Sequence, residues 1–309
     1  MTQSDSFFGV NSSLRSSIED LPRKIRDALS KVSGSAPYPR FAIDDAVDPQ
    51  EYKLLCEEFP DVLIAPSEDF GALTVLPDSP IHPNFPPSWT RFLESLRSDE
   101  VKNQLVAACY PQTIGRYPRW MQFMIRSRLQ NPDNYEVNIA FNLSIGQRYL
   151  PPHSDNSYKV LALVLYISTS STESIEFGTR FYSPKNKTAV RKAVKRFNRL
   201  ADFALIRNLP LEILPMTSCN IRNNCQEESD CNIAQAWFED NFLQDFTIGY
   251  KSNRIAGFIK TQSSFHAVDM RDAPHHEPRR TLLINLNLKH SSIARLGQSF
   301  RSRVLRMST

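Results

Sequence analysis

The segment from Arg279 to Leu288 alternates two kinds of side chain over ten residues, and this pattern constrains the fold more than any other. Successive side chains of a strand point to opposite faces of its sheet. One face therefore carries Arg280 followed only by apolar residues, and it should pack on a core layer. The other face is mixed and could line a polar cavity; it carries Arg279, Thr281, Leu283, Asn285 and Asn287.

Three further segments have the composition of strands. Residues 137–143 are near-alternating, residues 160–168 form a long apolar run rich in β-forming residues, and residues 255–261 form a shorter one. Runs of this length and content are typical of half-buried and fully buried strands. The chain is therefore expected to be mainly β.

Two histidines and one aspartate lie next to the ends of these expected strands. His153 and Asp155 lie between the first two segments, behind two prolines that fix the backbone, and His266 follows the third. Two imidazoles and one carboxylate can occupy one face of a metal ion and leave the opposite positions open. A His-x-Asp motif alone is weak in a chain with six histidines, and the order of the strands adds the specificity.

An arginine follows the second histidine at the start of the last strand. An arginine can hold a carboxylate through two parallel hydrogen bonds. The alternation places Arg279 on the mixed face, so Arg279 is favoured over Arg280 as the residue that points at a ligand. Arg280 is the alternative if the register is shifted by one residue.

Residues 138–182 and 255–288 resemble the catalytic core of the Fe(II)/2-oxoglutarate-dependent dioxygenases, in the prolyl-hydroxylase-like branch. The resemblance lies in five stretches: Gly146 to Asp155, Leu163 to Ser168, Phe177 to Tyr182, Lys260 to Val268, and Arg279 to Thr281. It implies a double-stranded β-helix of the jelly-roll or cupin type, with flanking helices. It also implies that His153, Asp155 and His266 hold Fe(II). Arg279 with Thr281 would bind the distal carboxylate of 2-oxoglutarate, and Tyr166 occupies the position of a tyrosine that often assists.

The resemblance implies a reaction as well as a site. O2 would be used to hydroxylate an unactivated C–H bond while 2-oxoglutarate loses CO2 and becomes succinate, with ascorbate as a reductant. Asp155 is present, which favours hydroxylation over halogenation. Two alternatives stay open: a catalytically silent jelly-roll binding protein, and a hydrolase that uses the same ligands for zinc. The substrate, a small molecule or a protein side chain, is not defined.

Composition limits the compartment and the partners. The net charge is +4, the hydrophobic content is 41% and the charged content is 23%, as in ordinary globular proteins. No run approaches the roughly 20 apolar residues that span a bilayer, and the first residues do not resemble a secretory signal. A cytoplasmic protein with no membrane or nucleic-acid partner is expected. Free thiols are favoured for Cys219, Cys225 and Cys231, with a disulfide or a soft-metal site as the open alternatives. The oligomeric state is not predicted.

The chain divides into three parts in sequence. Residues 1–36 form an N-terminal extension with a helix from about Ser12 to Val32, residues 37–290 form the dioxygenase domain, and residues 291–309 form a basic tail. An insert at about 185–250 interrupts the domain and is a candidate lid. Its expected basic helix, residues 188–203, would suit an anionic substrate, although a solvated face is the commoner explanation.

Overall fold

The computed structural model describes residues 11–32, 38–64, 70–77, 80–115, 119–144, 149–153, 155, 158–168, 173–186, 240, 242–261, 264–270 and 278–289. Its helices are α1 (Asn11–Lys31), α2 (Pro49–Glu57), α3 (Pro87–Leu96), α4 (Asp99–Ile114), α5 (Arg119–Gln130) and the short 3-10 helix η1 (Pro132–Asn134). Its strands are β1 (Arg40–Ile43), β2 (Phe70–Val75), β3 (Tyr135–Ser144), β4 (Tyr149–His153), β5 (Lys159–Ile167), β6 (Ser174–Pro184), β7 (Phe242–Tyr250), β8 (Ile255–Ile259), β9 (His266–Asp269) and β10 (Arg279–Leu288).

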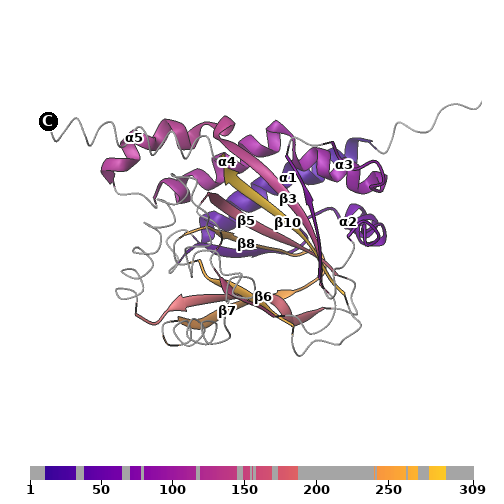
Figure 1. Cartoon of the computed structure of the whole chain (residues 1–309). Coiled ribbons are helices and arrows are strands. Elements are labelled where there is room, and N and C mark those ends of the chain that lie inside the picture. The colour runs from indigo at the N-terminus through magenta and orange to yellow at the C-terminus, as the bar shows by residue number, and fades with distance from the viewer. Residues whose placement is uncertain are drawn as a thin grey trace, which may run out of the picture.

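The strands form two sheets that face each other (Figure 1). The larger sheet has the order β1-β8-β5-β10-β3-β2 and the smaller has the order β4-β9-β6-β7. Every strand pair is antiparallel, and the chain crosses repeatedly from one sheet to the other. The fold is therefore a double-stranded β-helix with flanking helices, as predicted. Pro151 and Pro152 lie in β4, an edge strand, where a missing backbone donor is tolerated.

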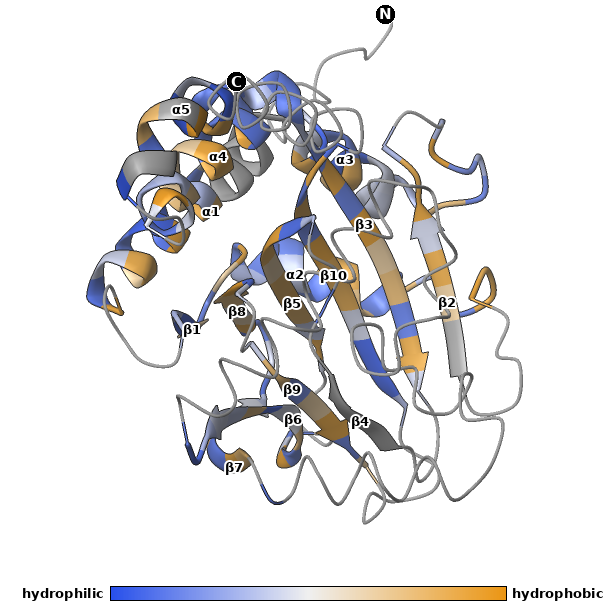
Figure 2. Ribbon diagram, turned by 60° about the vertical axis from the view of Figure 1, so that its left-hand side comes forward, coloured by the Kyte–Doolittle hydropathy of each residue, from blue (hydrophilic) through white to orange (hydrophobic). Residues whose placement is uncertain are grey.

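Helices cover the outer face of the larger sheet (Figures 1 and 2). Between these two layers lies the larger apolar core, in which Trp89 from α3 packs edge-on against Phe141 from β3 with ring centroids 4.8 Å apart. Helix α1 belongs to this layer, because its Leu21, Ile25 and Leu29 are buried in the same core. None of the described helices combines the length and the apolar character that crossing a bilayer requires.

A second core lies between the two sheets and is rich in aromatic residues. Tyr166 of β5 and Phe258 of β8 enter it from the larger sheet, and Phe177 and Phe181 of β6 enter it from the smaller one. Phe181 and Phe258 stand edge to face, with centroids 5.8 Å apart. These rings hold the two sheets together at one side of the space in which a site can form.

The alternation read from the sequence is present in β10. Leu282, Ile284, Leu286 and Leu288 belong to the core beneath the helices, so the residues between them face the smaller sheet. The prediction for the two faces of this strand is therefore confirmed. Helix α2 begins at a side-chain cap, since Asp48 Oδ1 accepts hydrogen bonds from Gln50 N and Glu51 N.

The insert expected at about 185–250 ends earlier than its expected boundary. Phe242–Tyr250 is strand β7 and pairs with β6. The strand completes the smaller sheet. The expected basic helix and the three cysteines lie outside the described residues, as does the C-terminal tail from residue 290 onward.

Candidate metal and co-substrate site

The pairing of β4 with β9 brings the two predicted histidine ligands to the same position along the smaller sheet. His153 ends β4 and lies opposite His266, the first residue of β9. Asp155 follows two residues after His153, and its Oδ2 lies 3.8 Å from His266 Nε2. The fold therefore brings Asp155 to His266 across more than a hundred residues of chain. The side chain of His153 lies outside the described part of the structure.

His266 is held in a defined orientation. It is buried, its ring lies against Phe258 with centroids 4.6 Å apart, and its Nδ1 lies 3.2 Å from the carbonyl oxygen of Ser264. A carbonyl oxygen only accepts, so this hydrogen bond places the proton of the neutral ring on Nδ1. The lone pair is then on Nε2, the nitrogen that faces Asp155, which is the arrangement that a metal-binding histidine uses.

Asp155 and His266 are two candidate ligands, and a site of two imidazoles and one carboxylate needs a third. Among the side chains that the structure describes, no group of three or more His, Cys, Asp or Glu residues gathers in one place. The backbone of His153 is paired directly with that of His266. His153 is therefore the residue from which a third ligand is expected.

Arg279 lies buried between the sheets. Its side chain is on the inner face of β10, its Nε donates to Phe177 O at 2.7 Å, and its guanidinium carbon lies 5.6 Å from the ring centre of Tyr166 and 5.7 Å from that of Tyr250. Burial lowers its pKa, and the two tyrosines act in the opposite direction. Among the described residues, no carboxylate forms an ion pair with it. A buried guanidinium without an acidic partner favours an anionic ligand.

Thr281 stands next to Arg279 on the same inner face. It is fully buried, and its Oγ1 has no hydrogen-bond partner within the described structure. An unsatisfied buried hydroxyl costs free energy that a ligand oxygen would recover. Arg279 and Thr281 together therefore offer donors to one anionic group.

Tyr166 and Arg280 are placed differently from what was expected of co-substrate contacts. The Tyr166 hydroxyl lies 2.8 Å from Thr179 Oγ1, accepts from Thr179 N at 3.1 Å and donates to Ile248 O at 3.2 Å. These contacts use its full hydrogen-bonding capacity and join the two sheets, and its ring lies near the Arg279 guanidinium. Arg280 points away from the inner face and forms two hydrogen bonds with Asp61, at 3.0 and 2.6 Å.

Lys159 is a residue at the site that the sequence analysis did not identify. Its Nζ lies 3.1 Å from Asp155 Oδ1, and both side chains are largely buried. A lysine four residues after an aspartate is a recognised pair on a helix, but here the segment between them leads from one strand into another. The sequence therefore carried no rule that would predict this contact.

The chain was compared with known proteins. No protein-family model matches it, and no curated protein matches it in sequence. Among solved structures it is similar to a Pseudomonas putida prolyl-4-hydroxylase, with 8% identity, 86% of this chain and 99% of that chain covered, and a TM-score of 0.44. It is also similar to HygX from Streptomyces hygroscopicus with nickel, 2-oxoglutarate and hygromycin B bound (9%, 85% and 87%, 0.43) and to a Trichoplax adhaerens prolyl hydroxylase in complex with a hypoxia inducible factor peptide (8%, 90% and 93%, 0.43).

Proposed function

We propose that this protein is an Fe(II)- and 2-oxoglutarate-dependent dioxygenase that hydroxylates an unactivated C–H bond. The observation that carries the proposal is the buried Arg279, which faces the interior of the β-helix and has no acidic partner among the described residues. Neither a zinc hydrolase nor a silent binding scaffold requires a buried cation in this place. A dioxygenase requires it for the distal carboxylate of its co-substrate.

The positions of the two candidate subsites agree with a short dicarboxylate. Arg279 is anchored at Phe177 of β6, and His266 lies opposite Phe181 of the same strand. Four residues of strand span about 13 Å, and both side chains project into the space between the sheets. This separation leaves room for a molecule that binds a metal at one end and a guanidinium at the other.

The chain's own residues have separate tasks in this proposal. His153, Asp155 and His266 would hold the metal, and Arg279 with Thr281 would orient the co-substrate. The bound iron supplies the oxidising chemistry with O2. The aromatic residues between the sheets, Phe177, Phe181 and Phe258, keep one side of the site apolar and limit the entry of water.

The test is metal-dependent succinate formation by metal-free protein. We expect succinate when Fe(II), 2-oxoglutarate, O2 and ascorbate are supplied, and none when Zn(II) replaces Fe(II). Asp155→Ala and His266→Ala should each remove this turnover, because each loses a ligand. His82→Ala is the matched control, since His82 is exposed and far along the chain from both ligand segments.

Each alternative gives its own result in the same experiment. A hydrolase would act on ester or amide substrates with Zn(II) and would form no succinate. A silent binding protein would form no succinate with any metal. Succinate formation that survives both Asp155→Ala and His266→Ala in folded protein would contradict the proposed site.

The primary substrate is a small molecule or a protein side chain. We propose that residues 187–239, which lie outside the described residues, take part in its recognition, because they connect β6 to β7 of the smaller sheet. A screen of metabolites and peptides for stimulated succinate release would identify the class. Charge reversal at Arg191, Lys195 and Arg199 should weaken an anionic substrate without changing the binding of the metal.

A further inference from the structure

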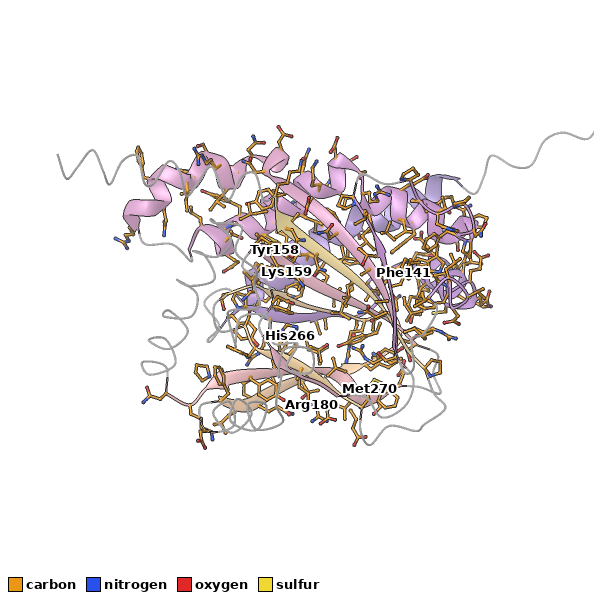
Figure 3. The ribbon with its side chains drawn as sticks, in the orientation of Figure 1. Phe141, Tyr158, Lys159, Arg180, His266 and Met270 are labelled. Carbon is orange, nitrogen blue, oxygen red and sulfur yellow. The ribbon has the colours of Figure 1, made fainter. Side chains whose placement is uncertain are left out.

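The two oxygens of the Asp155 carboxylate have different neighbours. Oδ1 lies 3.1 Å from the ammonium of Lys159, and Oδ2 lies 3.8 Å from Nε2 of His266. The side chains of Asp155 and Lys159 are each 15% exposed. Figure 3 shows Lys159 on the larger sheet and His266 on the smaller one, on the two sides of the space between the sheets.

The sheet fixes the position of Lys159. It begins β5 and lies opposite Asn287 of β10, and the residue before it, Tyr158, accepts a hydrogen bond from Leu288 N at 2.8 Å. Asp155, in contrast, lies in the connection between β4 and β5. The lysine is therefore the better-anchored member of the pair, and it can hold the carboxylate in one orientation.

We propose that Lys159 is a positioning residue for Asp155. By binding Oδ1 it directs Oδ2 toward His266 and so presents one oxygen to the metal. Lys159 itself does not contact the metal. This inference rests on the proposed function, since it assigns Asp155 as a ligand. Outer partners of metal ligands orient them in this way, and their loss typically weakens metal binding about 10- to 100-fold.

A purely electrostatic role for Lys159 predicts the opposite sign. A lysine ammonium close to a divalent cation repels it, so removal of the charge alone would tighten metal binding. Positioning and repulsion can therefore be separated by the direction of the change. The largely buried ion pair and the unequal neighbours of the two oxygens favour positioning.

The experiment measures Co(II) binding to metal-free protein by calorimetry and by visible absorption. Lys159→Met, which keeps the length of the side chain, should bind Co(II) about tenfold or more weakly, with an altered absorption spectrum. Lys159→Arg should restore most of the affinity, because it keeps the cation. Lys251→Met is the control: Lys251 Nζ lies 3.6 Å from Asp44 Oδ2 with side chains 48% and 47% exposed, and its loss should change nothing.

Thermal unfolding in chelator checks that each variant is folded. Lys159→Gln is the second variant if Lys159→Met does not fold, and the same loss of affinity is expected for it. Unchanged or tighter Co(II) binding by either folded variant would overturn the inference. Two results would instead refute the proposed metal site: wild-type protein that binds no Co(II), or a His266→Ala variant that binds Co(II) as tightly as the wild type.

Discussion

Replacing Arg279 by methionine should separate co-substrate binding from stability. Arg279 is 5% exposed, and its Nε donates a hydrogen bond to Phe177 O. Losing one neutral acceptor contact costs about 1 kcal/mol, and removing a desolvated charge without an acidic partner offsets part of that cost. The unfolding free energy of the free protein should therefore change by no more than about 1 kcal/mol.

The effect on 2-oxoglutarate should be much larger. Truncating one partner of a buried, hydrogen-bonded charge pair costs about 2–5 kcal/mol, which is a loss of roughly 30-fold to several thousandfold in affinity. Wild-type protein with 2-oxoglutarate at a hundred times its Kd should gain about 2.7 kcal/mol of stability. For Arg279→Met at the same concentration, a 30-fold loss of affinity would leave about 0.9 kcal/mol of that gain, and a larger loss would leave less.

Thermal unfolding with and without 2-oxoglutarate, in the presence of Mn(II), measures both quantities in one assay. Arg280→Met is the matched control, because Arg280 pairs with Asp61 at side-chain exposures of 27% and 39%. That pair should contribute about 0–1 kcal/mol to stability and nothing to the ligand-induced shift. A ligand-induced shift in Arg279→Met as large as that of the wild type, or one that is lost in Arg280→Met, would refute the assignment of the inner-face arginine.

Three further changes test the framework of the site. Tyr166→Phe removes the hydroxyl that joins Thr179 to Ile248. Chemical denaturation should show that the unfolding free energy falls by about 1–3 kcal/mol, while 2-oxoglutarate still stabilises the protein. An unchanged denaturation midpoint would contradict a stabilising role for these hydrogen bonds. Gly178→Ala would place its Cβ against the β7 backbone, 2.8 Å from Gly249 Cα, so the melting temperature should fall. A melting temperature equal to that of the wild type would contradict this close approach. Asn253 has φ of 53°, and its side chain forms hydrogen bonds with Val47 N and Val47 O at 2.9 and 2.7 Å. Both Asn253→Gly and Asn253→Ala should therefore destabilise the protein, and the glycine variant should lose less stability. Equal unfolding free energies for the two variants would show that φ is unimportant.

Local features of this chain were predictable from sequence where a short-range rule applies. The two faces of β10 follow from a period of two residues, and the N-cap at Asp48 follows from a side chain that bonds its own helix. Strand β7 was missed because four consecutive residues, Leu243 to Phe246, are exposed, and its register with β6 shifts between Phe181 and Tyr182. Apolar residues on a solvated face hide the alternation that identifies a half-buried strand.

Contacts that depend on how the strands pair do not follow from a short-range rule, and these decide the detail of the site. The pairing of β4 with β9 sets His153 opposite His266, and the entry into β5 sets Lys159 beside Asp155. Tyr166 illustrates the limit most clearly: its position on β5 suggested a ligand contact, but partners from β6 and β7 occupy its hydroxyl.

The two faces of β10 have different roles: one packs in the apolar core, and the other faces the candidate site. Its outward leucines and isoleucine pack beneath the helices, while Arg279 and Thr281 face the smaller sheet. Because both sets lie on one strand, a shift of register by a single residue would bury Arg280 and turn Arg279 outward. The apolar core beneath the helices therefore fixes the register, and the register in turn keeps a buried cation in the site. Substitutions such as Leu282→Ala or Ile284→Ala should accordingly reduce the unfolding free energy by about 2–5 kcal/mol. The affinity of the folded protein for 2-oxoglutarate should stay unchanged, and calorimetry at low temperature can measure it. Loss of affinity in parallel with stability would show that the outer core and the site are coupled by more than register.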